Sequence, residues 1–412
     1  MHEQLPRLSV SVIDVLPAVT VSTTWSLSPS LPSEHHLTFT AAPLLPSTMM
    51  TGAPTGGTFS PGSDDSPVKM PGQQARGSLV STCALLVGAL AVLLSGTVSL
   101  SRYPPRSFPR VVVGEEFLQE AGGQFVTLSK GRVHYVLREP TTPSDLPPVV
   151  LIHGFSLGCI IWNDVADALV SQGGRRVLAF DLYGRGYSDA AFPCDVELFS
   201  GQLTELLFAL QPILGPGPID IFGTSMGGAI AVHFTHLHPE RVRRLALLAP
   251  AGLPVNVPWT AKLGKLPFFG DIFMPILGPV SLRTYARKGH AYPDDPAFQP
   301  TFAAMSRVLR RQSQVNPAFF PALLSTLRDF PLNDLVWAYE SVARTREDGS
   351  VLVIWGDRDV ITPFMHASRV IDLLGGPAKA KLLVLDDCGH VDPLEVQRNI
   401  EEMMPPLLAH LG

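Results

Sequence analysis

The chain has 412 residues, a formal net charge of −5 and a pI of about 6.2. This length suits one large domain with extensions, and the mild acidity argues against a nucleic-acid partner, which usually requires a basic surface. The four cysteines, Cys83, Cys159, Cys194 and Cys388, show no paired spacing, so we expect neither a disulfide framework nor a zinc site.

The first segment, residues 1–76, is rich in Ser, Thr and Pro and has few charges. Such a composition cannot bury enough apolar surface to offset the entropy lost on ordering, so we predict that the segment is disordered. Translation starting at Met49, Met50 or Met70 would remove much of it, and the sequence leaves this alternative open.

Residues 77–101 contain no charged side chain. About 20 apolar residues at a rise of about 1.5 Å span a bilayer core of about 30 Å, so we predict a transmembrane helix here. A cleaved signal peptide is the alternative, although its apolar core usually has only about 7–15 residues. The flanking basic residues are Lys69, Arg76, Arg102, Arg106 and Arg110. Their excess of one on the C-terminal side weakly favours a single-pass membrane protein with a cytoplasmic catalytic domain.

From about residue 115 to 412, short apolar runs alternate with helical stretches. The runs expected to be strands are residues 148–153, 176–181, 219–222, 245–249, 351–355 and 381–385. Because these runs are continuous and not alternating, we expect strands that are covered on both faces, as in a parallel sheet. Residues 197–210 and 228–238 suit crossover helices. The predicted fold class is therefore α/β, with a doubly wound, mostly parallel sheet.

The alternation stops at about residues 251–335, where helical pieces and prolines replace buried strands. We interpret this segment as a helical cap inserted over the carboxyl edge of the sheet, which is where open α/β sheets bind ligands.

Gly223-Thr224-Ser225-Met226-Gly227 follows a predicted strand and precedes a predicted helix. This is the context of a nucleophile elbow, in which a strained turn exposes the serine and requires small neighbours. Ser225 at a helix N-terminus would also favour a developing oxyanion. We therefore predict Ser225 as the nucleophile.

Gly154-Phe155-Ser156-Leu157-Gly158 has the same spacing and also follows a strand. We rank Ser156 lower, because His153-Gly154 before it suits a loop that donates an oxyanion N–H group, and because the bulky residues 160–162 follow it. The backbone N–H groups of Phe155 and Met226 are the predicted oxyanion donors.

A general base is expected in the loop after the last strand, and His390 lies there. His233 and His236 are interpreted as residues on the surface of a helix. The loop after the preceding strand offers two acids, Asp357 and Asp359. Asp357 suits a turn that binds its own backbone, so we favour Asp359 as the acid that orients the histidine.

Five motifs occur in the order that the α/β-hydrolase superfamily shows, and over residues 115–412 the chain resembles that superfamily. The motifs are His153-Gly154 and residues 181–189, 223–228, 355–359 and 389–390. Within it, the chain resembles membrane-anchored monoacylglycerol lipases and bacterial carbon–carbon bond hydrolases. The resemblance implies no cofactor and no metal, and it implies that Asp359, the last residue of Gly-x-x-Asp, is the acid. Ser225 distinguishes the chain from the branches of the superfamily that use an aspartate nucleophile.

The predicted function is a serine hydrolase that cleaves a carboxylic ester through an acyl-enzyme intermediate. A lipid ester such as a monoacylglycerol is the expected substrate, on the grounds of the predicted membrane anchor and of the resemblance. The largely apolar residues 266–269 and 272–277 of the cap support this expectation. A thioesterase, a peptidase and a carbon–carbon bond hydrolase remain alternatives. A non-catalytic binding protein with the same fold is the alternative from another class.

Overall fold

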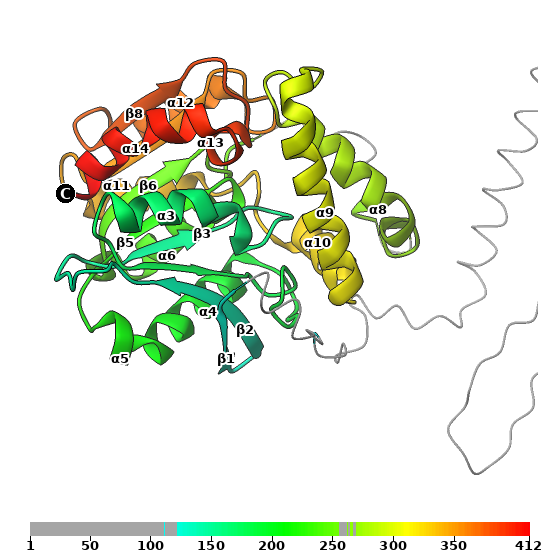
Figure 1. The fold of residues 1–412 in the computed structure, drawn as a ribbon, viewed down its shortest axis with the longest axis horizontal. Coiled ribbons are helices and arrows are strands. Elements are labelled where there is room, and N and C mark those ends of the chain that lie inside the picture. Colours follow the sequence, from blue (N-terminus) through cyan, green and yellow to red (C-terminus); the bar gives the residue numbers. More distant parts are fainter. Residues whose placement is uncertain (1–110, 112–121, 255–261, 263, 267–268) are drawn as a thin grey trace, which may run out of the picture. The chain divides into compact units, whose positions relative to one another are not determined.

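The computed structural model describes residues 111, 122–254, 262, 264–266 and 269–412 (Figure 1). The predicted disordered segment, residues 1–76, and the predicted transmembrane helix, residues 77–101, lie outside the described residues.

The predicted single-pass membrane localisation is corrected by the structure. Within the described ranges, the helices lack the combination of length and apolar character that crossing a bilayer requires. The longest of them, α8 (Phe269–Lys288), has 20 residues. It carries Asp271, Arg283, Arg287 and Lys288, and charged residues at this density are costly in hydrocarbon.

The described strands form one eight-stranded sheet in the order β1-β2-β4-β3-β5-β6-β7-β8. The strands are β1 (Gln124–Leu128), β2 (Gly131–Arg138), β3 (Val149–Ile152), β4 (Val177–Phe180), β5 (Ile219–Thr224), β6 (Val242–Leu248), β7 (Val351–Gly356) and β8 (Ala380–Leu385). In this order, all neighbouring strands from β4 through β3 to β8 pair in parallel. Strand β2 pairs antiparallel with both β1 and β4. The predicted mostly parallel α/β sheet is confirmed, with all six predicted strands in place.

The hairpin formed by β1 and β2 was not predicted from the sequence. Its strands are only partly buried and lack a continuous apolar run, because they lie at one edge of the sheet. At the other edge, β8 exposes Lys381 and Leu382, so it is not covered on both faces as expected.

Helices cover the two faces of the sheet (Figure 1). Val149 and Leu151 of β3 pack against α3 (Asn163–Ser171) and α14 (Gln397–Leu411). The alternate residues Val150 and Ile152 belong to a second core. This core includes residues of α4 (Val196–Ala209), α6 (Met226–Leu237), α11 (Val336–Thr345) and α12 (Ala367–Leu373). The alternation follows from the period of two along a strand.

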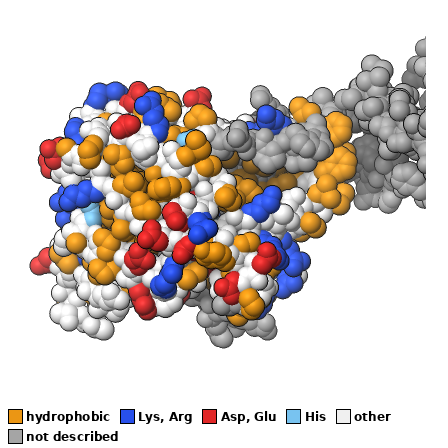
Figure 2. Space-filling view, turned by 90° about the horizontal axis from the view of Figure 1, so that it is seen from above, with side chains coloured by type: hydrophobic (Ala, Val, Ile, Leu, Met, Phe, Trp, Pro, Cys, Tyr) orange, Lys and Arg blue, Asp and Glu red, His pale blue; other side chains and the backbone are white. Residues whose placement is uncertain are grey.

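The chain between β6 and β7 forms α8, α9 (Gln299–Val315) and α10 (Phe319–Asp329), which we call the helical insertion. Its apolar core contains Leu282, Met305, Leu309, Phe319 and Leu323. Phe155 and Leu157, from the loop after β3, pack against this core. The opposite face of α8 is apolar and exposed, with Ile276 and Val280 at 64% and 66% exposure. Figure 2 shows apolar side chains gathered at this end of the described part.

The remaining short elements connect these layers. They are η1 (Cys159–Trp162), α5 (Gln211–Leu214), η2 (Pro239–Arg241), η3 (Pro296–Phe298), η4 (Phe364–His366) and α13 (Asp392–Glu395).

Candidate active site

The three residues predicted to carry the chemistry follow strands that end at one edge of the sheet. Ser225 follows β5, Asp359 comes three residues after β7, and His390 lies in the loop after β8. Because β5 to β8 are parallel neighbours, their carboxyl ends lie side by side. The sheet therefore brings the three side chains to a common region.

Ser225 occupies a strained turn, with φ 55° and ψ −119°. Its N–H donates to Leu248 O at 2.9 Å, and α6 begins at the next residue. A Cβ atom at Gly223 would lie 2.4 Å from Gly227 O, and one at Gly227 would lie 2.1 Å from Ile152 O. The turn thus requires glycine on both sides of the serine, and Ser225 stays half-buried at the N-terminus of a helix.

His390 pairs with a buried acid, Asp359. Nδ1 of His390 lies 2.7 Å from Oδ2 of Asp359, and the Asp359 side chain is fully buried. The other carboxylate oxygen accepts from the backbone N–H groups of Ile361, at 2.8 Å, and Thr362, at 3.0 Å. With Nδ1 as the donor to the carboxylate, a neutral His390 has its lone pair on Nε2, as a general base requires.

Thr362 also belongs to this arrangement, although the sequence did not single it out. Its hydroxyl lies 2.8 Å from Oδ2 of Asp359, 3.1 Å from Nδ1 of His390 and 3.1 Å from Ala249 O. The one available signal was a threonine three residues after the acid, which is a common turn pattern.

Ser225 forms no direct hydrogen bond with His390, both being residues that the structure describes. Such bonds are often long before a substrate binds. The structure therefore joins His390 to Asp359 directly and brings Ser225 to the same edge through its strand.

The two alternative residues occupy different settings. Asp357 is exposed, and it accepts from Cys388 N at 3.1 Å without a bond to His390. Ser156 lies in the loop after β3, and it is not among the described residues that have positive φ. Asp357 therefore lacks the bond to His390 that Asp359 forms, and Ser156 lacks the strained backbone of Ser225.

The loop that contains Ser156, residues 153–158, passes next to Ser225. A Cβ atom at Gly154 would lie 3.4 Å from Cβ of Ser225. Nε2 of His153 accepts from Leu182 N at 2.9 Å, so Nδ1 carries the proton and donates to Gly154 O at 2.9 Å. Burial lowers the pKa of His153 to about 4, which keeps this ring neutral.

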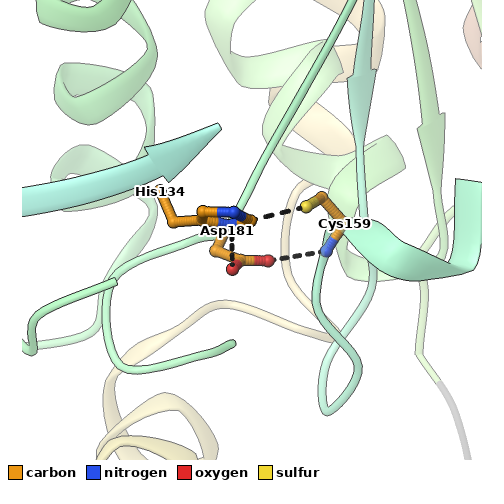
Figure 3. A group of neighbouring side chains, drawn as sticks. All are labelled: His134, Cys159 and Asp181. Atoms are coloured by element: carbon orange, nitrogen blue, oxygen red, sulfur yellow. Dashed lines mark hydrogen bonds and ion pairs between the residues drawn. The ribbon is translucent and has the colours of Figure 1, made fainter. Parts of the chain in front are cut away.

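His134, Cys159 and Asp181 are the described residues whose donor atoms lie close enough together to suggest a metal site (Figure 3). The nitrogens of His134 both donate, Nδ1 to Asp181 at 2.8 Å and Nε2 to Gly122 O at 2.8 Å. Although burial opposes the charge, the Asp181 carboxylate raises the pKa of His134. Burial raises the pKa of the Cys159 thiol. Because both ring nitrogens of His134 donate, the ring has no lone pair left for a metal ion, and the raised pKa of Cys159 disfavours the thiolate that metal ions bind. These residues therefore do not fit a metal ion.

This cluster instead fixes two loops near the site. One Asp181 oxygen accepts from Cys159 N at 2.7 Å, and the other accepts from Tyr187 N at 2.9 Å. Burial alone would raise the pKa of Asp181, but His134 outweighs it and holds that pKa at about 2. A Cβ atom at Gly158 or Gly186 would come within 2.5 Å or 2.0 Å of the carboxylate.

A second buried acid lies next to His390. Oδ2 of Asp392 accepts from Gly389 N at 2.7 Å and from Ala291 N at 2.9 Å, and Oδ1 pairs with His290. This acid joins the His390 loop to the segment after α8. Glu395 lies 3.7 Å from Nε2 of His290, and burial, followed by the Asp392 charge, raises the pKa of Glu395 to about 8.

His233 and His236 are not surface residues as expected. His233 is 4% exposed and binds the hydroxyl of Ser200 at 2.8 Å. His236 is half-buried and binds the hydroxyl of Ser341 at 2.7 Å. Both rings contact Trp337 edge to face, so packing between α6 and α11 explains them.

Comparison with known proteins identifies relatives of this chain. Residues 147–395 match the family described as alpha/beta hydrolase fold. A dihydrolipoyllysine-residue acetyltransferase component of an acetoin cleaving system from Pseudomonas putida is 30% identical over 265 residues, which cover 62% of either chain. The chain thus spans less than two thirds of that relative.

Two other relatives are hydrolases by name. A 2-hydroxymuconate semialdehyde hydrolase from Pseudomonas sp. (strain CF600) is 28% identical over 270 residues, covering 64% of this chain and 87% of the relative. A human (lyso)-N-acylphosphatidylethanolamine lipase is 26% identical over 156 residues, covering 38% of this chain and 45% of the lipase.

Solved structures show the same fold. An enol-lactonase from Burkholderia xenovorans LB400 superposes with a TM-score of 0.56 at 17% identity, covering 70% of this chain and 99% of the lactonase. An esterase from Thermogutta terrifontis superposes with a TM-score of 0.55 at 20% identity, covering 70% and 99% of the two chains.

Proposed function

The chain belongs to the α/β-hydrolase fold family, and on that premise we propose that it is a serine hydrolase that cleaves carboxylic esters through an acyl-enzyme intermediate. The observation that carries the proposal is the bond of His390 to the buried carboxylate of Asp359, at 2.7 Å, on the sheet edge where Ser225 occupies its strained turn. A histidine with one nitrogen bound to a buried carboxylate is oriented to accept a proton at the other.

In the proposed mechanism, Nε2 of His390 takes the proton of the Ser225 hydroxyl, and the oxygen attacks the ester carbonyl carbon. The N–H groups of Phe155 and Met226 hold the resulting oxyanion. Collapse of the intermediate breaks the carbon–oxygen bond, and His390 returns its proton to the leaving alcohol. Water that gives a proton to His390 then attacks the acyl-enzyme, and Ser225 recovers its proton as the acid leaves.

We propose a lipid ester such as a monoacylglycerol as the substrate. The support is the apolar core of the helical insertion, which Phe155 and Leu157 join from the loop beside Ser225. One relative is named a lipase of an acylated phospholipid. Turnover should therefore rise with acyl length in a series of esters from two to sixteen carbons. Turnover confined to the shortest soluble esters would contradict this substrate class.

Labelling by a fluorophosphonate probe tests the serine mechanism. The wild type, Ser225→Ala and Ser156→Ala are compared, with folding checked by circular dichroism. We expect labelling to be lost in Ser225→Ala alone. Loss in Ser156→Ala alone would assign the nucleophile to the other serine. A folded wild type without labelling would favour a binding protein.

Two substrates separate esterase activity from carbon–carbon bond hydrolysis, which one relative's name suggests. The wild type and the two serine variants are each assayed on p-nitrophenyl butyrate and on a vinylogous 1,5-diketone. We expect turnover of the ester and not of the diketone.

A further inference from the structure

Three consecutive carbonyl groups in the loop beside Ser225 each accept a hydrogen bond from a buried side chain. Gly154 O accepts from Nδ1 of His153 at 2.9 Å. Phe155 O accepts from Nε of Arg185 at 3.1 Å, and Ser156 O accepts from Nε2 of Gln312 at 3.2 Å. About two-thirds of protein hydrogen bonds join backbone to backbone, so three consecutive carbonyl groups held by side chains distinguish this part of the loop.

Arg185 has an unusual environment for a cation. Its side chain is fully buried, and within the described residues it forms no ion pair with a carboxylate. Its guanidinium donates to Phe155 O, to Tyr183 O at 3.1 Å and to the hydroxyl of Thr326. It also lies over the rings of Phe155 and Phe199, at 5.9 Å and 5.3 Å from their centroids. A buried charge is costly without an opposite charge, and such departures from local stability are typical of functional sites.

Both the oxygen and the nitrogen of the Gln312 side-chain amide form hydrogen bonds. Its Oε1 accepts from Gly186 N at 2.7 Å, while Nε2 donates to the loop. Gln312 belongs to α9 and Thr326 belongs to α10. The two contacts therefore join the loop and the turn after β4 to the helical insertion.

The direction of the Phe155 N–H group depends on these bonds. In a trans peptide the C=O and N–H groups point in opposite directions, so a fixed Gly154 carbonyl fixes the Phe155 N–H. The next two carbonyls, held by Arg185 and Gln312, prevent the loop from rotating about that peptide. A shift of about 1 Å in a catalytic group is enough to lower a rate strongly.

We propose that Arg185 and Gln312 are positioning residues that hold the loop beside Ser225 in the orientation needed to stabilise the oxyanion, and that the helical insertion acts on catalysis through them. The inference rests on the proposed function. Neither residue touches the reacting atoms, so their loss acts on the transition state and leaves ground-state binding largely intact.

The test uses the full chain with the variants Arg185→Met, Arg185→Lys and Gln312→Leu. The matched control is Asn316→Leu. Asn316 is 1% exposed, lies at the end of α9 and donates to Ser188 O at 3.1 Å, and none of the hydrogen bonds described for its side chain reaches residues 153–158. The measurements are kcat and KM for p-nitrophenyl butyrate and the inhibition constant of a trifluoromethyl ketone, which forms a tetrahedral adduct with a serine.

We expect kcat to fall by about 10- to 100-fold in Arg185→Met and Gln312→Leu, somewhat less than the loss of one oxyanion donor. KM should change by less than about threefold, and the inhibition constant should rise by the same factor as kcat falls. Arg185→Lys, which keeps one cationic donor, should recover part of the loss. Asn316→Leu should lower the melting temperature comparably while kcat stays within about twofold.

Two results would overturn this inference and leave the proposed function intact. One is a wild-type kcat and inhibitor affinity in folded Gln312→Leu and Arg185→Met. The other is an equal fall of kcat in Asn316→Leu, which would show a general effect of loosening the insertion. An absence of ester turnover and of fluorophosphonate labelling in the wild type would overturn the proposed function as well.

Discussion

The hydroxyl of Thr362 lies 2.8 Å from Oδ2 of Asp359, the same oxygen that binds His390. A hydrogen bond to a charged group contributes about 1.5–3 kcal/mol, so its loss leaves the carboxylate less well held. We expect Thr362→Val to lower kcat by about tenfold, and Thr362→Ser, which keeps the hydroxyl, to stay within about threefold of the wild type. Steady-state kinetics on a soluble ester checks this, and equal effects of both substitutions would assign the loss to packing.

The acid is tested by comparing Asp359→Asn with Asp357→Asn. An asparagine at 359 removes the charge and favours the wrong histidine tautomer, so kcat should fall by about 10⁴-fold. Asp357 is exposed, and among the contacts described for it the carboxylate accepts a hydrogen bond only from the Cys388 N–H, so Asp357→Asn should keep most of the activity. The reverse order would move the acid to position 357.

Two glycine substitutions, one in the turn at Ser225 and one in helix α4, should have opposite effects on stability. In Gly227→Ala the new Cβ atom would lie 2.1 Å from Ile152 O. We expect the free energy of unfolding to fall by about 3 kcal/mol and the activity to be lost. In Gly201→Ala, within α4, the new atom would meet nothing within 4 Å. That substitution should stabilise the protein by about 0.5–1 kcal/mol with activity unchanged. Urea unfolding measures both values.

Glu395 predicts a pH dependence of stability. Its pKa in the folded protein, raised by burial, is about 8, against about 4.3 in an unfolded chain. Between these values the folded state holds a proton that the unfolded state has released, so stability falls as the pH rises. Below pH 4 both states are protonated and this penalty is absent.

Glu395→Gln removes that titration. The variant should match the wild type near pH 4.5 and melt at least about 3 °C higher at pH 8. The exposed Glu240→Gln serves as the control and should show no such trend. A difference in melting temperature that is the same at both values of pH would contradict the assignment.

Much of the fold could be predicted because its signals are local. Each central strand is a continuous apolar run, and the elbow at Ser225 is a contiguous motif. The β1–β2 hairpin had no such signal, because its strands are only partly buried at the sheet edge.

The supporting residues of the site could not be predicted for a different reason. Arg185 and Gln312 are 127 positions apart in the chain, and they reach the same loop from two different elements, the turn after β4 and helix α9 of the insertion. Likewise, the sequence offered no way to tell that His233 packs between helices rather than facing solvent. Contacts of this kind depend on tertiary packing, whereas Asp359 and His390 could be chosen by their place after strands.

The backbone conformation of Ser225 exposes the serine for reaction but lowers the stability of the folded chain. At φ 55° a residue with a side chain is strained by about 1–2 kcal/mol, whereas glycine adopts this conformation freely. The chain would therefore be more stable without its proposed nucleophile, as is common where function opposes stability. Ser225→Gly should then be more stable than the wild type and inactive, and it should bind the ester without cleaving it. This variant is therefore a useful form for capturing and identifying the natural substrate.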